Sequence, residues 1–317
     1  MKKHTRKRGV ILLACILAAA LCACSSPGGE EQSGKKKSEE QKEEVEEKAQ
    51  GPVVEEQVLY EKDGVRITAK ELKVEEMEDY SWATLNLLLE NEGSEDIVCE
   101  MNAMLVNHYE MNSGPLHVPQ TVPAGKKANV SLDIRESDMT KAGFELKEIG
   151  EVEAEFKLGK VSGGTTGLSS TGLLSVKTSD YDKIESKPAE GGKEIYNEAG
   201  VRIVYLGMSE GGEEGAYDFG ADIFIENTSD KSVTCWITGG NIDGTEVNSY
   251  NTPHVSAGRM ARSSIDFFGD AAANMDIDSM NEITVKVELS GDGITDEEGY
   301  PDYETIADYK DVTFSIK

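Results

Sequence analysis

The sequence predicts an all-β protein built as two tandem β-sandwich domains. Three observations predict it: a long stretch occurs twice, apolar residues alternate with polar ones, and turn residues recur about every 8–12 positions. Beyond Pro52 the apolar period is two rather than the 3.6 of a helix. Such alternation places apolar side chains on one face of a strand, as expected for a sheet that is covered on that face.

The repeated stretch sets the organisation of the chain. Tyr60–Cys99 aligns without a gap with Tyr196–Cys235 at a constant offset of 136 residues. After a three-residue shortening, Ala124-Gly125-Lys126 matches Ala257-Gly258-Arg259. The sequence therefore predicts a tandem repeat of about 125 residues per copy, and a copy of this length is long enough to hold its own core.

Each repeat is expected to contain seven or so short strands. The central strand ends in Glu90-Asn91-Glu-Gly-Ser94 in the first copy and in Glu226-Asn227-Thr-Ser-Asp230 in the second. Asn, Gly, Ser and Asp accept turn geometry and hydrogen-bond to their own backbone. In the first copy, strands are expected at 65–69, 85–89, 97–101, 132–134, 151–158 and 173–178, with a helical crossover at 138–142. In the second, they are expected at 201–203, 221–225, 233–237, 265–267, 282–289 and 311–316, with a crossover at 270–274.

The first 23 residues have the pattern of an export signal. Five positive charges and no acid precede an apolar run from Val10 to Ala23, which is too short to span a bilayer. The run ends Leu21-Cys22-Ala23-Cys24, which resembles the lipobox of bacterial lipoproteins. The resemblance implies that Cys24 is acylated and becomes the first mature residue. The alternative is an ordinary secretory signal with incidental cysteines.

A linker rich in Ser, Gly, Glu, Lys and Gln follows the signal. It cannot bury enough apolar surface to offset its chain entropy, so we expect it to be disordered. The chain then divides into a signal peptide (1–23), a lipidated disordered linker (24–51), a first β-sandwich (52–180), a connector (181–193) and a second β-sandwich (194–317). The expected location is the extracytoplasmic face of the cell membrane, with the lipid anchor as the membrane contact.

The charge of the chain argues against nucleic acid as a partner. The formal net charge is −28, and removal of the five positive charges of the signal brings it to −33. Binding to phosphate needs a surplus of Lys and Arg on one face. This balance is consistent with a well-solvated exported surface, or with a cationic partner or ion.

Only two cysteines follow Cys24, and they occupy the same position in the two repeats. Cys99 and Cys235 each share a strand face with apolar neighbours, so we interpret both as small buried core residues. The alternative is an inter-domain disulfide, which equivalent core positions of separate domains seldom form. No Cys-x-x-Cys pair for zinc or redox chemistry is present.

The repeats resemble the immunoglobulin-like domains of unknown function in Gram-positive bacterial lipoproteins. The resemblance rests on the Gly-Val-Arg-Ile strand, the Glu-Asn turn, the Ala-Gly-[Lys/Arg] turn and the closing amphipathic strand, and it covers nearly all of both repeats. It implies two tandem immunoglobulin-like β-sandwiches. It hardly specifies function, because such sandwiches serve many unrelated functions. The disulfide packed on a core tryptophan is absent, because one cysteine per repeat cannot form a bridge within a domain; in addition, Trp82 and Trp236 lie on non-equivalent strands.

Catalytic signatures are missing from the sequence. Beyond the signal there are three histidines, His108, His117 and His254, and none belongs to a His-Glu-x-x-His zinc pair. No Gly-x-Ser-x-Gly elbow presents a serine nucleophile, and the Ser/Gly/Thr cluster at 162–172 lacks the Gly-Lys-[Ser/Thr] of a phosphate loop. We therefore predict that the protein is not an enzyme and uses no cofactor.

Two groups of residues are candidate binding sites. The acidic loop with Asp292, Asp296, Glu297 and Glu298 offers oxygen ligands for Ca²⁺, although its spacing does not fit an EF-hand and a solvated hairpin is the simpler interpretation. The aromatic residues of the second repeat offer a surface for a glycan or a peptide: Trp236, Tyr250, Tyr300 and Tyr303. Trp236 points away from the Cys235 face, so its alternative role is to cover the rear of the sheet.

The function expected from these observations is that of a membrane-anchored extracytoplasmic lipoprotein that acts as a non-enzymatic binding or protein-interaction module. The partner would be an unidentified protein or another component of the cell envelope. A first alternative is a lipoprotein that binds a solute or an ion, including Ca²⁺, and assists transport. A second is a cell-wall hydrolase with an unrecognised carboxylate pair. Because the loops differ more than the strands, we expect the two repeats to bind different ligands, or only one of them to bind.

Overall fold

The computed structural model describes residues 51–76, 80–111, 119–161, 168–211, 217–291, 294–295 and 301–317. It is all-β, as predicted, and residues 48–317 form one compact unit. No helix in these ranges is long and apolar enough to cross a membrane.

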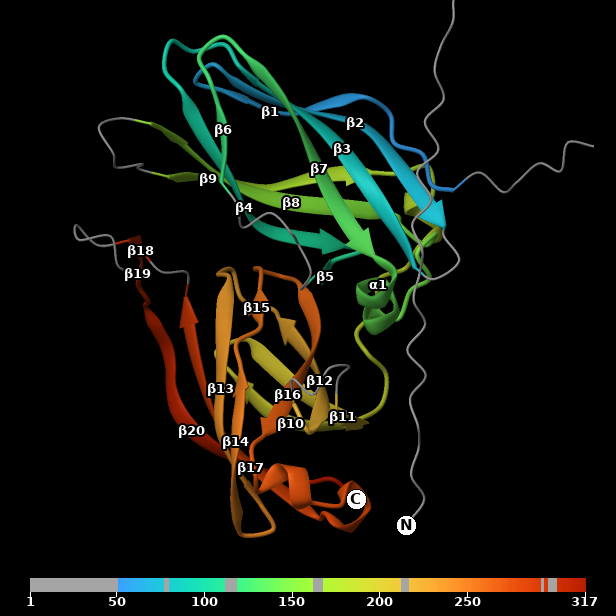
Figure 1. Ribbon diagram of the computed structural model, residues 1–317, viewed down its shortest axis with the longest axis vertical. Coiled ribbons are helices and arrows are strands. Elements are labelled where there is room, and N and C mark those ends of the chain that lie inside the picture. Colours follow the sequence, from blue (N-terminus) through green and yellow to red (C-terminus); the bar gives the residue numbers. More distant parts are fainter. Residues whose placement is uncertain are drawn as a thin grey trace, which may run out of the picture. The chain divides into compact units, whose positions relative to one another are not determined.

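The first repeat has two sheets, and the chain crosses from one to the other and back. One sheet has the order β1-β2-β3-β7, from β1 (Gln57–Lys62), β2 (Val65–Glu76), β3 (Ser81–Asn91) and β7 (Lys127–Arg135). The other pairs β4 (Ile97–Val106) with β8 (Glu151–Lys160), and β8 with β9 (Ser169–Lys177). Two short strands, β5 (Tyr109–Glu110) and β6 (Gln120–Val122), also pair with β4. The chain leaves the first sheet after β3 and returns for β7, which is the Greek-key connection of immunoglobulin-like sandwiches (Figure 1).

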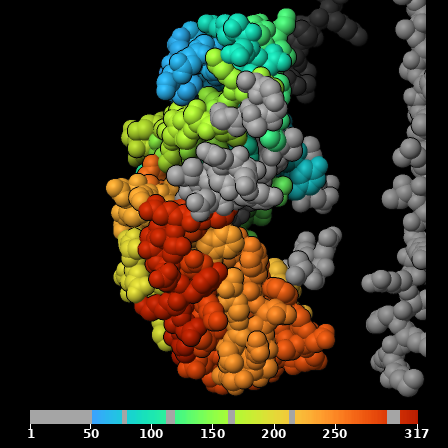
Figure 2. Space-filling view, turned by 90° about the vertical axis from the view of Figure 1, so that its left-hand side faces the viewer, coloured from blue at the N-terminus to red at the C-terminus, as the bar shows by residue number. Residues whose placement is uncertain are grey.

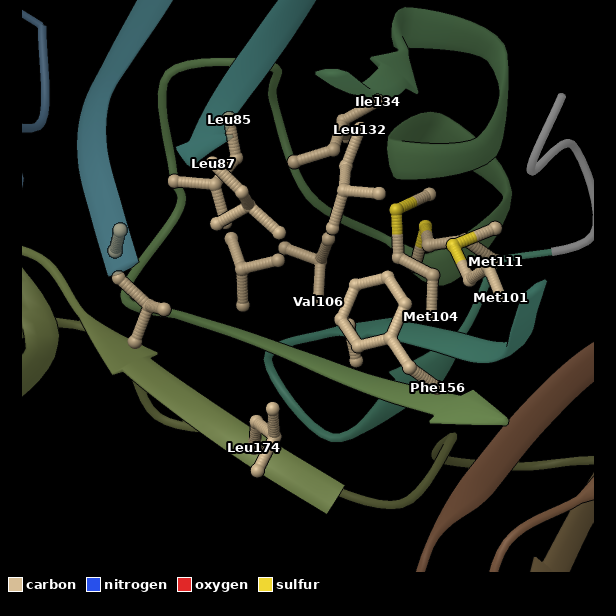
Figure 3. Packing of buried hydrophobic residues seen from close by; sticks show 14 of the residues in the cluster. Leu85, Leu87, Met101, Met104, Val106, Met111, Leu132, Ile134, Phe156 and Leu174 are labelled. Atoms are coloured by element: carbon tan, nitrogen blue, oxygen red, sulfur yellow. The ribbon is translucent and has the colours of Figure 1, made fainter. Parts of the chain in front are cut away.

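Inward-facing apolar residues of both sheets form the core of the first repeat. Leu85 and Leu87 from β3 and Leu132 and Ile134 from β7 face Phe156 of β8, and all are almost fully buried (Figure 3). The periodicity of two in these strands is what brings their side chains to one face.

The second repeat has the same order of strands. Its first sheet joins β10 (Lys193–Glu198), β11 (Val201–Glu210), β12 (Phe219–Asn227) and β16 (Met260–Phe268). Its second joins β14 (Thr245–Asn251), β13 (Val233–Ile242), β17 (Glu282–Gly291) and β20 (Thr305–Ser315). The short β15 (His254–Val255) pairs with β13, and β18 (Ile294–Thr295) with β19 (Pro301–Asp302). In addition, β14 pairs with β16, so hydrogen bonds join the two sheets along that side.

The opening hairpins show that the duplication preserved the register. Tyr60 pairs with Ile67 and Tyr196 with Ile203, and each hairpin has one irregularity just before that tyrosine. Each turn has two residues with positive φ, the second being Gly64 (φ 78°) or Gly200 (φ 81°). Two successive positive φ values define the type I′ turn that matches the twist of a hairpin, and glycine reaches them without steric cost.

The asparagine of each Glu-Asn turn is a buried clamp. The side-chain amide of Asn91 donates to the carbonyls of Glu95 and Val122, both within 2.9 Å, and its oxygen accepts from the amide of Gly93. Asn227 makes the equivalent contacts in the second repeat, to the carbonyls of Lys231 and Val255. The turn therefore holds its own backbone and also ties the central strand to the short strand β6 or β15.

The crossovers are helical, as predicted. The first is α1 (Glu136–Ala142), which ends at Gly143 with a φ of 90°. The second is shorter: η3 (Ala272–Asn274) and η4 (Ile277–Ser279) are single 3₁₀ turns. A further turn, η1 (Tyr181–Lys183), lies in the predicted connector.

Cys99 and Cys235 are free and buried, which confirms their interpretation as core residues. Burial raises the pKa of each thiol from 9.0 to about 12. A thiol with such a pKa is inert at neutral pH, because the thiolate is the reactive form.

The chain meets itself where it enters and leaves the first repeat. The amide of Ser179 donates to the carbonyl of Val53 at 2.8 Å, and the amide of Val53 donates to the Ser179 hydroxyl at 3.1 Å. The start of the first repeat is thus fixed to the segment that follows β9.

Candidate functional site

Several predicted site residues lie outside the described residues. They are Cys24, Tyr300 and the four acids of the calcium loop, Asp292, Asp296, Glu297 and Glu298. Lipidation at Cys24 and calcium binding at the loop therefore stay predictions.

The structure brings two of the predicted aromatic residues together. The rings of Trp236 and Tyr303 meet edge to face, with centroids 5.8 Å apart. The indole N–H of Trp236 donates to the hydroxyl of Ser290 at 2.7 Å, so this polar atom has a partner in the sheet. Tyr250 lies on β14 directly opposite Thr238, two residues along β13 from Trp236. Because side chains alternate along a strand, Trp236, Thr238 and Tyr250 share the outer face of the sheet.

Tyr309 belongs to the same face, and sequence reasoning missed it. It lines a shallow hollow of ≈ 480 Å³ with Thr238, Lys286 and Asp311. A hydrogen bond to the carboxylate of Glu288 raises the pKa of Tyr309. We call Trp236, Tyr250, Tyr303 and Tyr309 the tyrosine face; its three tyrosines are 53%, 44% and 54% exposed. Figure 2 looks onto the strands that carry it, with β20 in red beside the orange strands of the second repeat.

A larger hollow lies on the first repeat, where β3 begins and β7 gives way to α1. Its volume is ≈ 900 Å³, and we call it the Trp82 hollow. The rings of Tyr80 and Trp82 are stacked there, with centroids 5.2 Å apart and planes within 15°. The two residues are two apart on an extended segment, so their side chains project to the same face.

Charged side chains of both signs surround this aromatic pair. Asp133 and Arg135 come from the end of β7, and Glu136 and Lys141 from α1. Asp133 is held in place because its carboxylate accepts a hydrogen bond from the hydroxyl of Thr84, with 2.9 Å between the two oxygens. A second hollow of ≈ 520 Å³ shares Glu136 with the first, together with Ser81 and Thr140. The two hollows therefore adjoin along α1.

Buried ionic contacts join the two repeats. The guanidinium of Arg259 donates to both oxygens of Glu153, at 2.9 Å from Nε and 2.5 Å from Nη2, and Glu153 is only 3% exposed. The amide of Met260 donates to the carbonyl of His108 at 3.1 Å. Beside these contacts, the ring of Tyr109 lies 6.2 Å from that of Phe224. We call these residues, together with Glu110, Glu151, His254 and Ser256, the repeat junction.

Glu110 is the most confined acid of the repeat junction. Its carboxylate accepts the backbone amide of Ser256 at 2.8 Å, and Nδ1 of His254 lies 3.8 Å away. Burial raises the pKa of Glu110, and the opposing effects of His254 and Ser256 do not cancel that shift. The neighbouring Glu151 accepts from Ser175 and bonds Nε2 of His108 at 2.9 Å.

Three of these residues have the geometry of metal ligands. Ligand atoms of His108, Glu151 and Glu153 all lie within 4.8 Å of one another. However, Arg259 already binds both oxygens of Glu153, and a divalent ion there would face the guanidinium charge. The arrangement therefore fits an internal ion pair better than a metal centre.

No protein-family model matches the chain, and no curated protein sequence matches it. Among solved structures, the YadV chaperone is similar over 72% of this chain and 91% of its own, at 10% identity and a TM-score of 0.22. A protein of unknown function from Porphyromonas gingivalis W83 is similar over 78% and 98%, at 12% identity and a TM-score of 0.22. The Pseudomonas aeruginosa CupB2 chaperone is similar over 71% and 92%, at 11% identity and a TM-score of 0.19. Similarities this weak carry no argument about the function of this chain.

Proposed function

We propose that the protein is a lipid-anchored extracytoplasmic lipoprotein that acts as a non-enzymatic protein-interaction module. The tyrosine face is the observation that carries this proposal. Tyrosine and tryptophan combine a large apolar area with a polar atom, and they are enriched where proteins bind partners. Three tyrosines on one sheet face are each about half exposed. Their apolar ring area is unfavourable in contact with water and is covered when a partner binds.

The sheet beneath the tyrosine face supports this function because it is rigid. Trp236 is fixed by Ser290 and Tyr303, and the strand that carries it is paired on both sides. Side chains that are already ordered lose less entropy when a partner binds. Lys286 and Asp311 at the hollow add one charge of each sign, which would orient a partner.

Photo-cross-linking on intact cells tests the interaction. A photoreactive amino acid replaces Thr238, at the centre of the tyrosine face, in the full-length protein. We expect a discrete adduct that is lost when Tyr309→Ala is added and retained when Tyr80→Ala is added, since Tyr80 is equally exposed on the other repeat. An adduct that survives Tyr309→Ala combined with Tyr250→Ala would contradict the proposal.

The anchor is tested separately. Metabolic labelling with palmitate is expected to mark the wild-type protein and to fail for Cys24→Ala, while Cys22→Ala remains labelled. The unlabelled variant should leave the membrane fraction, because the acyl chains supply about 0.8 kcal/mol per buried CH₂. Equal labelling of wild type and Cys24→Ala would refute this assignment.

A further inference from the structure

We propose that the Trp82 hollow is a second binding site, separate from the tyrosine face, and that it takes an uncharged oligosaccharide. The proposal starts from the exposed ring of Tyr80, which is stacked on the ring of Trp82. Their rings are nearly parallel and 5.2 Å apart, and Tyr80 remains 60% exposed. An exposed aromatic face of this kind complements the C–H-rich face of a sugar ring, which is apolar although its edge carries hydroxyls.

The surroundings of the aromatic pair fit the edge of such a ring. Asp133 and Glu136 offer acceptors, Arg135 and Lys141 offer donors, and Thr140 adds a hydroxyl that does both. A sugar hydroxyl is itself both donor and acceptor, so it can use either kind of group. Hydrogen bonds to charged groups are stronger than those between neutral groups, so a few of them suffice to orient a sugar ring.

The charge balance selects an uncharged ligand. The two acids and two bases of the lining cancel, and the chain as a whole is strongly acidic, with a net charge of −28. An anionic polymer would be repelled by the surrounding surface. Because the lining itself has no net charge, it gives a charged ligand of either sign no net attraction inside the hollow.

The dimensions favour more than one sugar ring. At ≈ 900 Å³ the hollow is near the upper end of small-ligand sites, which run from about 300 to 1,000 Å³. The adjoining hollow adds ≈ 520 Å³ and shares Ser81, Glu136 and Thr140 with the first. A chain of sugar rings can follow this trough along α1.

The site belongs to the first repeat alone. The residue that matches Trp82 in the second repeat, at the offset of 136, is Asp218, and the residue that matches Arg135, at the offset of 133, is Phe268. Neither the aromatic pair nor the charged edge is therefore repeated. The tyrosine face is likewise specific to the second repeat, because Glu100 stands where the second repeat has Trp236.

The two tryptophans of the chain allow each site to be observed by itself. In Trp236→Phe, Trp82 is the only tryptophan, and its fluorescence reports on the hollow. The full-length protein, in a detergent without a sugar headgroup, is titrated with cellotetraose, with fully N-acetylated chitotetraose and, as the peptide probe, with tetraalanine. We expect a saturable change with at least one of the two sugars and none with tetraalanine.

Variants of Tyr80 decide whether the response comes from the aromatic pair. Tyr80→Ala in the same background should weaken sugar binding about tenfold, equivalent to about 1.4 kcal/mol, and Tyr80→Phe should retain it. Trp82→Phe, with Trp236 as the only reporter, should show no response. If Trp236→Phe does not fold, saturation-transfer NMR of the sugars with the wild type and Tyr80→Ala replaces the fluorescence assay.

Three results would overturn the proposal: no saturable response to either sugar, a response that Tyr80→Ala leaves unchanged, or saturation by tetraalanine as well as by a sugar. None of them depends on the tyrosine face. Loss of the cross-linked adduct there would leave sugar binding at the Trp82 hollow untouched.

Discussion

Arg259 of the second repeat and Glu153 of the first form a two-point ion pair, in which Nε and Nη2 each bond one carboxylate oxygen. The contact lies between residues 106 positions apart, and Glu153 is almost fully buried by it. Two parallel hydrogen bonds from a planar guanidinium hold the carboxylate close to its plane, so the pair restricts direction as well as distance. The two repeats therefore share a specific contact in addition to the covalent connector.

Removal of this arginine should destabilise the protein strongly. Arg259→Ala leaves Glu153 charged, buried and without its partner, and we expect a loss of about 3 kcal/mol in the free energy of unfolding. Urea denaturation provides the measurement. The control is Arg66→Ala, which removes a more exposed ion pair with Glu61 and should lower the free energy of unfolding much less. Equal effects of the two substitutions would show that the buried ion pair contributes no more to the free energy of unfolding than the exposed one.

The buried asparagine clamps should matter equally in both repeats. Asn91→Ala leaves the buried carbonyl of Val122, the carbonyl of Glu95 and the Gly93 amide without their partner, and we expect a cost of about 2 kcal/mol. Asn227→Ala should cost a similar amount. Asn197→Ala, which removes an exposed asparagine, should stay within about 0.5 kcal/mol of the wild type. Chemical denaturation of the three variants checks the order, and a mild Asn91→Ala would show that the turn holds without its clamp.

Glu110 should make stability depend on pH. Its pKa is raised in the folded state, so folding favours its protonated form. The stabilisation is complete below the usual value of 4.5 and is lost as the pH rises through the raised pKa. Glu110→Gln still accepts from Ser256 but does not titrate. The free energy of unfolding of the variant minus that of the wild type should therefore increase from pH 5 to pH 8. A difference that is constant over this range would show that Glu110 does not titrate there.

The two core thiols should not react in the folded protein. With pKa values of about 12, Cys99 and Cys235 hold almost no thiolate at pH 8, and both are buried. Iodoacetamide followed by peptide mass spectrometry should find neither modified in native buffer and both modified in urea. Rapid modification of one of them in native buffer would identify a repeat that opens readily.

Much of the fold could be predicted because the repeat supplied each pattern twice. The Glu-Asn turns, the alternating strands and both crossovers were predicted from residues that act locally. The repeat junction was not predicted, and Glu153 shows why. In Glu151-Val-Glu-Ala-Glu-Phe156 the glutamates alternate with apolar residues and suggest a solvated face, yet Glu151 and Glu153 are buried. Glu282, which matches Glu151 in the second repeat, is exposed. Burial here depends on a neighbour far along the chain, which periodicity does not reveal.

The candidate sites divide in the same way. The Tyr80-Ser81-Trp82 alternation predicts that both rings lie on one face, so the aromatic pair was within reach of sequence reasoning. The charged edge of the hollow was not, because Asp133 and Glu136 come from elements that only the fold brings next to β3. Tyr309 was missed for a related reason: its place beside Thr238 depends on the pairing of β17 with β20 and on the irregularities within it.

The hydrogen bonds between Val53 and Ser179 determine how the molecule would carry a mechanical load. When the chain is pulled from its two ends, tension enters the first repeat near Val53 and leaves it near Ser179. Part of it crosses from one to the other through these two bonds, and the contacts of the repeat junction carry the rest, so the sandwich between Val53 and Ser179 is shielded while the two bonds hold. Once they break, tension reaches β1 and β9 directly, and the first repeat begins to extend. The first repeat would thus supply extra chain length once the applied force exceeds the force that breaks this pair of contacts.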